Sequence, residues 1–425
     1  MRSNFFKLFL LITFLFLSNG DLLAQVNWTK YSGNPVITGG QNGAWDRHKF
    51  MPSILYNTDS TRYEIWYSAS VGESVGWRPY RIGFATSEDG INWTVRADPV
   101  LTPGLAGEWD ANTVEAAYVI RENDQYKMWY TSGSGKNGYA TSPDGINWTK
   151  YSGNPIFEAG TQSWEAGGVY MGCVLPVTGG YKMWYSGWTA GVTHESIGYA
   201  TSADGIFWQR DTLNNPVIED GLSGSWDDVG VYLPSVLFID NLYYLWYGGM
   251  GSIVQIGLAT SPDGINWTKH PDNPVVKPSS FGHWDDYYVE EGRVLFMDDT
   301  LYMWYGASGG SGSNYLWQIG LATSTFEPVS VDESVIQPSE FILNQNYPNP
   351  FNPSTTFRYS IPTQSKVVIK VFDMLGNEIA TLMDEEKTVG TYELTWNAQN
   401  LSSGIYFYQL KAGESINTKK MILLQ

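Results

Sequence analysis

The sequence predicts an all-β fold: a five-bladed β-propeller followed by a small Ig-like β-sandwich. Three observations predict it. Short phrases repeat five times over residues 26–324, tight-turn signals separate short apolar runs, and strand signals continue after the repeat stops at residue 324. The composition agrees, because 45 Gly, 28 Tyr and 19 Trp residues are typical of short strands joined by turns.

Five copies of one unit follow each other at a period of about 55 to 65 residues, the scale of a propeller blade. The phrase Ile-Gly-Xaa-Ala-Thr-Ser begins at Ile82, Ile197, Ile256 and Ile319, and a variant begins at Gly138. The phrase Asp-Gly-Ile-Asn-Trp, or a close relative, ends at Trp93, Trp148, Trp208 and Trp267. A Trp followed by an acid lies at Trp45, Trp109, Trp164, Trp226 and Trp284. A strand ending in Trp-Tyr closes at Tyr67, Tyr130, Tyr185, Tyr247 and Tyr305.

Each unit contains four strand-like runs, which in the second unit span 114–120, 126–130, 138–141 and 146–150. Asp144-Gly145 between the last two runs predicts a two-residue type I′ hairpin turn, since Gly tolerates the positive φ that such a turn needs. Four antiparallel strands at this period predict one blade.

The ring can be closed from the sequence alone. The fifth unit lacks its final Asp-Gly-Ile-Asn-Trp strand, whereas residues 26–30 read Val-Asn-Trp-Thr-Lys and match it. We therefore expect the N-terminal strand to complete the last blade.

Residues that recur in nearly every unit have a structural explanation. The acids of the Asp-Gly phrase are expected to fix turns, and the Trp-Tyr pairs are expected to pack between blades. These acids are Asp89, Asp144, Asp204 and Asp263.

The chain is expected to be exported. Residues 1–24 have the charged start and short apolar run of a signal peptide, and no later segment is long and apolar enough to span a membrane. The propeller is assigned to residues 25–325, a linker to 326–340 and the sandwich to 341–425. The net charge of −18 argues against nucleic acid as a partner, and the single cysteine, Cys173, is expected to be a buried thiol.

The C-terminal segment resembles a known family. Strand signals span 357–361, 366–372, 392–396 and 405–411. The runs Asn-Tyr-Pro-Asn-Pro-Phe-Asn-Pro at 346–353, Val-Phe-Asp-Met-Leu-Gly at 371–376 and Gly-Ile-Tyr-Phe at 404–407 resemble the type A sorting domain of the type IX secretion system of Bacteroidota and related phyla. The resemblance implies transport across the outer membrane by that machinery. A carbohydrate-binding module is the alternative.

Function is sought where the blades depart from their own consensus. The inner strand of each blade starts after the Trp-acid pair, at the funnel of the propeller. Aligned there are Phe50, Glu115, Tyr170, Tyr232 and Glu290. Carboxylates on an otherwise aromatic strand are costly to bury unless they serve a purpose, although a pairing of Glu290 with Arg293 is the structural alternative.

The propeller also resembles the five-bladed glycoside hydrolases of families 43 and 130. Val-Glu-Glu-Gly-Arg-Val at 289–294 is similar to the Glu-Asp-Pro-Arg-Val stretch of the mannoside phosphorylases, and Pro-Ser follows the inner-strand start at 52–53 and 234–235 as in family 43. The chain departs from these families at three points: blade one lacks an Asp-Pro, blade three lacks a Glu-Gly-Pro, and Gly292 stands where a Pro is expected.

The resemblance implies a glycan-active protein whose paired carboxyls hydrolyse a glycosidic bond. The candidate catalytic residues are Glu290, Glu115, Glu291 and Asp46. The candidate sugar-binding residues are Arg293, Arg47, His48, Asn112, Tyr170, Trp188 and Trp77, and Trp317 is a further loop aromatic. The alternative is a glycan-binding or adhesion propeller without catalysis. No cofactor is predicted, a carboxylate-bound Ca²⁺ in the central channel is left open, and a monomer is expected.

Overall fold

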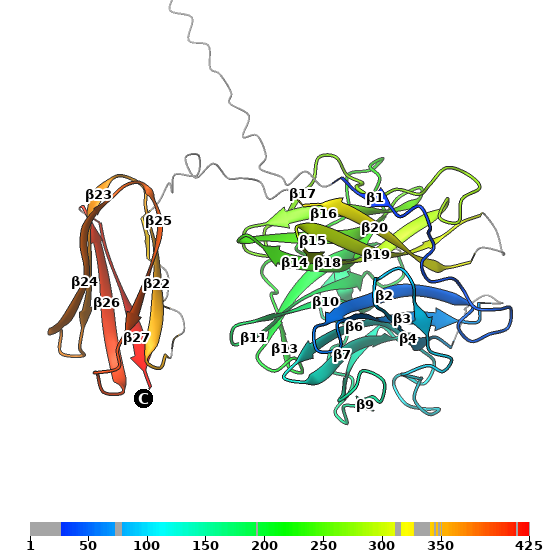
Figure 1. Cartoon of the computed structure of the whole chain (residues 1–425), viewed down its shortest axis with the longest axis horizontal. Helices are drawn as coiled ribbons and strands as arrows, with labels where there is room; N and C mark the ends of the chain where they lie inside the picture. The colour runs from blue at the N-terminus through cyan, green and yellow to red at the C-terminus, as the bar shows by residue number, and fades with distance from the viewer. Residues whose placement is uncertain are drawn as a thin grey trace, which may run out of the picture. The chain divides into compact units, whose positions relative to one another are not determined.

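The computed structural model describes residues 27–72, 79–192, 194–310, 316–326, 341–343, 346, 349, 351–413 and 415–424. The chain divides into two compact units, Met1–Pro328 and Val329–Gln425 (Figure 1). Over the described residues there are only strands and one 3₁₀ turn, η1 (Ser163–Glu165), so the predicted all-β class is confirmed. The expected signal peptide and nearly all of the expected linker lie outside the described residues.

The first unit is a ring of five four-stranded blades, as predicted. Blade one contains β2 (His48–Asn57), β3 (Arg62–Ser70), β4 (Arg81–Ser87) and β5 (Thr94–Val95). Blade two contains β6 (Val114–Glu122), β7 (Gln125–Ser132), β8 (Lys136–Ser142) and β9 (Thr149–Lys150). Blade three contains β10 (Gly168–Val177), β11 (Gly180–Trp188), β12 (Glu195–Ser202) and β13 (Trp208–Arg210). Blade four contains β14 (Gly230–Ile239), β15 (Leu242–Met250), β16 (Val254–Ser261) and β17 (Thr268–Lys269).

Blade five joins the two ends of the propeller. It contains β18 (Tyr288–Met297), β19 (Thr300–Ser308), β20 (Gln318–Thr325) and the N-terminal β1 (Thr29–Lys30). Strand β1 pairs with β20 in antiparallel register, Thr29 opposite Thr323 (Figure 1). The predicted closure is therefore confirmed.

The predicted two-residue hairpin turn is wrong. Strand β8 ends at Ser142 and β9 begins only at Thr149, and Asp144 does not have the positive φ of a type I′ turn. The Asp144 carboxylate instead accepts the backbone N–H groups of Ile146 and Asn147, at 2.9 and 2.8 Å. Those N–H groups are thereby taken from the strand, which shortens β9. The expectation that the Asp fixes the turn is confirmed in this way.

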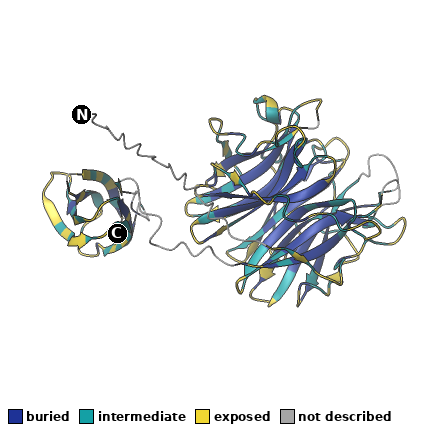
Figure 2. Cartoon of the chain, turned by 90° about the horizontal axis from the view of Figure 1, so that it is seen from above, coloured by how far each residue is buried: buried dark blue, intermediate teal, exposed yellow. Residues whose placement is uncertain are grey.

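In four of the five blades the Trp of the Trp-Tyr pair donates a hydrogen bond to a neighbouring blade. Trp66 Nε1 donates to the carbonyl of Gly145 at 2.8 Å, and Trp304 Nε1 donates to that of Gly90 at 3.0 Å. The rings are fully buried, and Figure 2 shows the blade interiors as buried strands. At the closing seam the Asp-Gly turn is missing, and the indole N–H groups of Trp28 and Trp246 have no acceptor among the described residues.

The acid after the first Trp of each unit is part of the scaffold. Asp110 is buried, accepts the hydroxyl of Tyr130 at 3.2 Å and forms an ion pair with Lys150 at 2.7 Å. Glu165, Asp227 and Asp285 repeat this arrangement with Arg210, Lys269 and Lys30. The column therefore joins the second strand of a blade to its outermost strand.

The second unit is a sandwich of two sheets. One sheet has the order β21 (Ile342–Leu343), β22 (Ser354–Ile361), β25 (Gly390–Asn397). The other has the order β24 (Glu378–Lys387), β23 (Ser365–Phe372), β26 (Gly404–Ala412), β27 (Ser415–Leu423). Phe357, Ile369 and Tyr408 are fully buried in its core. The four expected strands are present, and β21, β24 and β27 are additional.

Candidate functional site

The inner strands β2, β6, β10, β14 and β18 share an irregularity where they begin. In β18 the pairing with β19 breaks between Glu290 and Arg293, so two residues bulge out of the ladder. The same break follows Phe50, Glu115, Tyr170 and Tyr232 in the other blades. These are the residues that the sequence alignment placed in one column, and a bulge re-aims the side chains around it.

The first bulge residue adopts a left-handed backbone in four blades. Its φ is 60° at Glu291 and 49°, 48° and 47° at Met51, Ala116 and Leu233. Because apolar residues share this conformation, the bend belongs to the architecture and is not peculiar to the acid. Met51, Ala116 and Leu233 pack in one cluster with Tyr170, Tyr232 and Tyr288, so this cluster brings together the inner strands of all five blades.

Two adjacent carboxyls, Glu290 and Glu291, enter this cluster. The Tyr232 hydroxyl donates to Glu290 Oε2, and the Met51 backbone N–H donates to Glu291 Oε2. Glu291 is buried and Glu290 is half-buried. Burial raises the pKa of both carboxyls, and the charge of Glu290 raises that of Glu291 further. The pair therefore holds a proton into the neutral range, which is what a general acid needs.

A third carboxyl, Glu195, was not singled out in the sequence. It is half-buried at the start of β12, directly opposite Trp188 of β11. Burial, and next the charge of Glu290, raise the pKa of Glu195 to about 7. A signal was present: two residues before the Ile of the repeated phrase, the other blades have Tyr80, Gly135, Val254 and Trp317.

Arg293 is the first residue of β18 to pair with β19 again after the bulge, and it is buried. Its Nε and Nη1 donate to the carbonyls of Pro52 and Pro234 at 3.2 and 2.6 Å. Its guanidinium also lies 5.1 Å from the centre of the Tyr118 ring. Arg293 thus links blades one, two and four, which differs from the sugar-holding role expected of it.

Blade one holds three of the other expected residues, in distinct environments. Asp46 forms an ion pair with the buried Lys49 at 3.0 Å, in place of the outer-strand cation of the other blades. The His48 ring is buried and accepts the Trp317 backbone N–H at Nδ1. Burial, and next the charge of Arg47, lower the pKa of His48 to about 4, so the ring is neutral at pH 7. Arg47 is half-buried.

Blades two and three contribute the remaining expected residues. Glu115 is buried before its bulge, and Asn112 is exposed at the approach to it. Tyr170 packs against Trp188 with ring centres 5.0 Å apart and the ring planes tilted by 36°. Gly168 makes room for this platform, because a Cβ there would lie 2.3 Å from the Trp188 ring. Trp77 lies outside the described residues.

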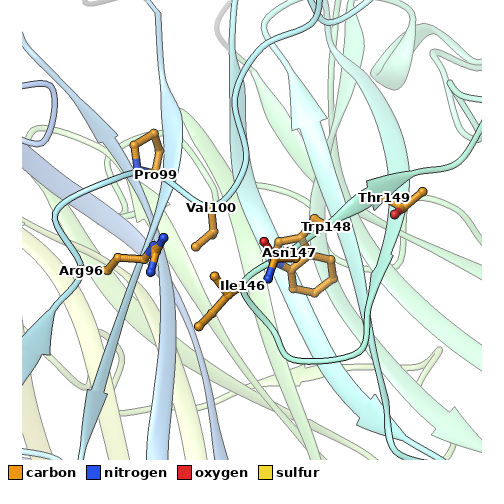
Figure 3. Close-up of a pocket in the computed structure, with 7 residues that line it drawn as sticks. All are labelled: Arg96, Pro99, Val100, Ile146, Asn147, Trp148 and Thr149. Atoms are coloured by element: carbon orange, nitrogen blue, oxygen red, sulfur yellow. The ribbon is translucent and has the colours of Figure 1, made fainter.

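The rim of the propeller contains grooves that have a different origin. One groove lies between Arg96, Pro99 and Val100 of blade one and the stretch Ile146–Thr149 of blade two (Figure 3). A second is built from the matching residues of blades three and four. Both follow from the repeat and lack the acids of the funnel. Over the described residues, no cluster of three or more His, Cys, Asp or Glu could hold a metal ion.

Known proteins match the two units separately. Residues 345–424 match the family described as secretion system C-terminal sorting domain. The C-terminal unit is therefore a sorting domain, as its resemblance implied, and it marks the chain for export to the cell surface or beyond. Within the part of the chain that the structure describes, no helix is long and apolar enough to cross a membrane.

The propeller has relatives of low identity. The uncharacterized protein MT1551 of Mycobacterium tuberculosis is 28% identical over 235 residues, 51% of this chain and 74% of that protein. A glycosyl hydrolase from Bacteroides ovatus has a TM-score of 0.55 and 20% identity, over 70% of this chain and 93% of the other. The β-1,2-mannobiose phosphorylase of Listeria innocua has a TM-score of 0.53 and 15% identity, over 70% and 96%. The expected likeness to glycoside hydrolase propellers is confirmed at the level of the fold.

Proposed function

We propose that this chain is an exported glycoside hydrolase that cleaves a polysaccharide or oligosaccharide in the propeller funnel. The observation that carries the proposal is the Glu290–Glu291 pair, because two neighbouring carboxyls with raised pKa values stand where blades one, three and four have only aromatic or apolar residues. Perturbed carboxyls of this kind gather at catalytic sites. The fold relatives that act on glycosides support the same class of substrate.

Glu290 is assigned as the general acid and Glu115 as the general base. Glu290 gives its proton to the leaving oxygen as the bond from the anomeric carbon to that oxygen breaks. A water molecule forms the new bond to the anomeric carbon and gives its proton to Glu115. Blades two and five are not adjacent in the ring, which favours the wider carboxyl spacing of an inverting enzyme, roughly 6.5–9.5 Å. Glu291 is the alternative acid. Asp46 is the weaker alternative, because its carboxylate already forms an ion pair with Lys49.

The platform formed by Tyr170 and Trp188 is assigned to stack on a sugar ring, since aromatic faces offer a large apolar surface with a polar edge nearby. Asn112 and Arg47, at the start of their inner strands, are assigned to bind hydroxyls. His48 would act only through its neutral ring. We also propose that type IX machinery exports the chain and that the sorting domain takes no part in catalysis.

The test is hydrolysis by the purified full-length mature chain, screened on plant and microbial polysaccharides. In an active parent, Glu290→Gln and Glu115→Gln should each lower turnover about 10²–10⁴-fold while sugar binding is retained. Asp59→Asn, which alters an acid in the turn between β2 and β3, at the end of an inner strand away from the funnel, is the matched control and should leave turnover unchanged. A parent that binds glycans but releases no reducing ends supports the non-catalytic alternative. Near-full turnover after both Gln substitutions contradicts the assignment.

A further inference from the structure

Four of the five blade junctions contain a pair of indole groups that share one acceptor. At the junction of blades one and two, Trp66 and Trp148 both donate from Nε1 to the carbonyl of Gly145, at 2.8 and 3.0 Å. In each pair one indole belongs to the second strand of the neighbouring blade, and the other follows the glycine by three residues. Three further glycine carbonyls accept two indole N–H groups in the same way, those of Gly90, Gly205 and Gly264.

The closing seam, which is the junction of blades four and five, has the two rings without the glycine. Trp246 of β15 and Trp28, which directly precedes β1, have ring centres 6.2 Å apart and ring planes at 82°. The rings of Trp66 and Trp148 are 6.3 Å apart at the same angle, so the indoles of the seam are arranged like the pair that shares Gly145. Both seam nitrogens are buried, and neither has an acceptor among the described residues. Because a buried N–H without an acceptor is destabilising, the seam is a preformed site for one carbonyl oxygen.

The sequence supplies a carbonyl at the matching position. In the other blades the glycine stands three residues before the Trp of the outermost strand, and Gln25 stands three residues before Trp28. Gln25 lies just outside the described part of the chain, which begins at Asn27. It is also the residue expected to become the first of the mature chain when the signal peptide is removed after Ala24.

Gln25 differs from the four glycines in having a side chain. The glycines have φ between 74° and 83°, a left-handed conformation that a residue with a Cβ rarely adopts. A Cβ on Gly145 would also lie 2.9 Å from the Trp66 ring. An N-terminal residue has no preceding carbonyl and hence no φ, so it can turn its Cβ away from the ring and still present its own carbonyl. In the precursor, Ala24 precedes Gln25 and this freedom is absent.

We propose that the closing seam is a docking site for the N-terminus of the mature chain, whose Gln25 carbonyl accepts the indole N–H groups of Trp28 and Trp246. Removal of the signal peptide then completes the ring, because it creates the residue that fits the site. This inference concerns maturation, so it goes beyond the proposed reaction and does not depend on hydrolysis in the funnel.

The experiment observes the two indole N–H groups directly. Full-length mature chain starting at residue 25, released from a cleavable fusion, is labelled with ¹⁵N-tryptophan, and the two signals are identified by their loss in Trp28→Phe and Trp246→Phe. Removing residue 25 alone, in a chain that starts at Val26, should speed hydrogen exchange of both indole groups at least about 10-fold. The melting temperature should fall by roughly 2–6 °C. The indole of Trp66, whose acceptor is untouched, is the internal control.

Three further chains test which atom docks and why residue 25 must come first. In the mature chain, Gln25→Ala keeps the backbone carbonyl and should leave indole exchange slow, because the side-chain amide is not the ligand. In a chain that keeps residues 21–24, Gln25 would need the left-handed φ, and both indoles should exchange as fast as in the chain starting at Val26. Adding Gln25→Gly to this extended chain removes the Cβ and should return slow exchange.

Each result supports or overturns one step. Equal exchange rates in the chains starting at residues 25 and 26 overturn the docking, since water or another group then satisfies the indoles. Fast exchange in Gln25→Ala overturns the assignment to the backbone carbonyl. Slow exchange in the extended chain without Gln25→Gly overturns the link to removal of the signal peptide. Slow exchange that is lost with residue 25, lost again in the extended chain and recovered with glycine supports the proposal.

Discussion

The buried scaffold acids, which follow the first Trp of each unit, and the buried acids of the funnel are stabilised in different ways. Asp110 is 2% exposed and has a lysine and a tyrosine hydroxyl as partners, and the same arrangement returns in other blades. Glu291 is 4% exposed, yet its partners are a backbone N–H, which donates to it, and a second carboxyl, with which it shares a hydrogen bond. A carboxylate that is paired with a cation stabilises the fold, whereas a carboxyl that retains its proton near neutral pH is able to donate that proton. Acids that recur with the repeat therefore belong to the scaffold, whereas the acids of the candidate site are departures from it.

The largest effect on stability is expected from removing the N-terminal strand that completes blade five. Deleting residues 26–32 from the mature chain removes β1, its pairing with β20 and the ion pair of Lys30 with Asp285. The melting temperature should fall by roughly 10 °C or more, since several hydrogen bonds and a buried pair are lost together. Calorimetry measures it, with the chain starting at residue 25 as reference. An unchanged melting curve contradicts the closure.

Substitution of a single scaffold acid should have the next largest effect on stability. Asp110→Asn leaves Lys150 and Tyr130 without the carboxylate and should lower the free energy of unfolding by about 3 kcal/mol, as for other broken buried pairs. Glu158→Gln breaks the exposed pair with Lys136 and should change it by less than about 1 kcal/mol. Urea unfolding measures both. Equal effects would erase the distinction between scaffold and surface pairs.

The stability that the neutral funnel acids contribute should fall as the pH rises. Burial raises the folded-state pKa of Glu290 above its ordinary value, so the stability of the neutral form is complete below about pH 4.5 and is lost as the pH rises through neutrality. Glu290→Gln cannot ionise, so its melting temperature should gain roughly 2–4 °C on the parent between pH 5 and pH 8. A constant difference across this range would show that Glu290 is already charged at pH 5.

The smallest effect is expected from removing the sorting domain. A mature chain ending at Phe326 keeps every blade, because Phe326 packs on Tyr244 and Phe296 at the end of the propeller. Its melting temperature and any glycan activity should match those of the propeller transition in the full chain. Calorimetry and the polysaccharide assay measure them. Failure of this chain to fold would show that the sandwich supports the propeller.

Much of the fold follows from the sequence because the repeat states it five times. The ring closure depends on one missing strand and its match at residues 26–30, and it is confirmed. The turn type failed because the side chain of Asp144 competes for N–H groups that a type I′ hairpin leaves to the strand. Strand β24 was missed because Asp384, Glu385 and Glu386 interrupt its apolar pattern at the exposed edge of its sheet.

The site could be predicted only in part. Departures from the consensus led to Glu290, Glu291 and Glu115, since an acid stands out in a column of aromatic residues. Glu195 was missed because it departs at the start of a third strand, where the repeated phrase draws attention two residues later. The burial of Arg293 depends on carbonyls from blades one and four, and contacts between distant blades leave no local signal.

The place of the closing strand sets an order of assembly. Blades two, three and four are built from hairpins between sequence neighbours, but β1 must wait for β20, from which nearly the whole propeller separates it. Long-range pairing of this kind forms late, because the entropy of a large loop is lost before any contact rewards it. Until then the edge of β20 and the indoles of Trp28 and Trp246 are open to other chains. The strand that pairs last is therefore the first strand of the propeller to be synthesised, and the ring is most vulnerable to aggregation until the two strands pair.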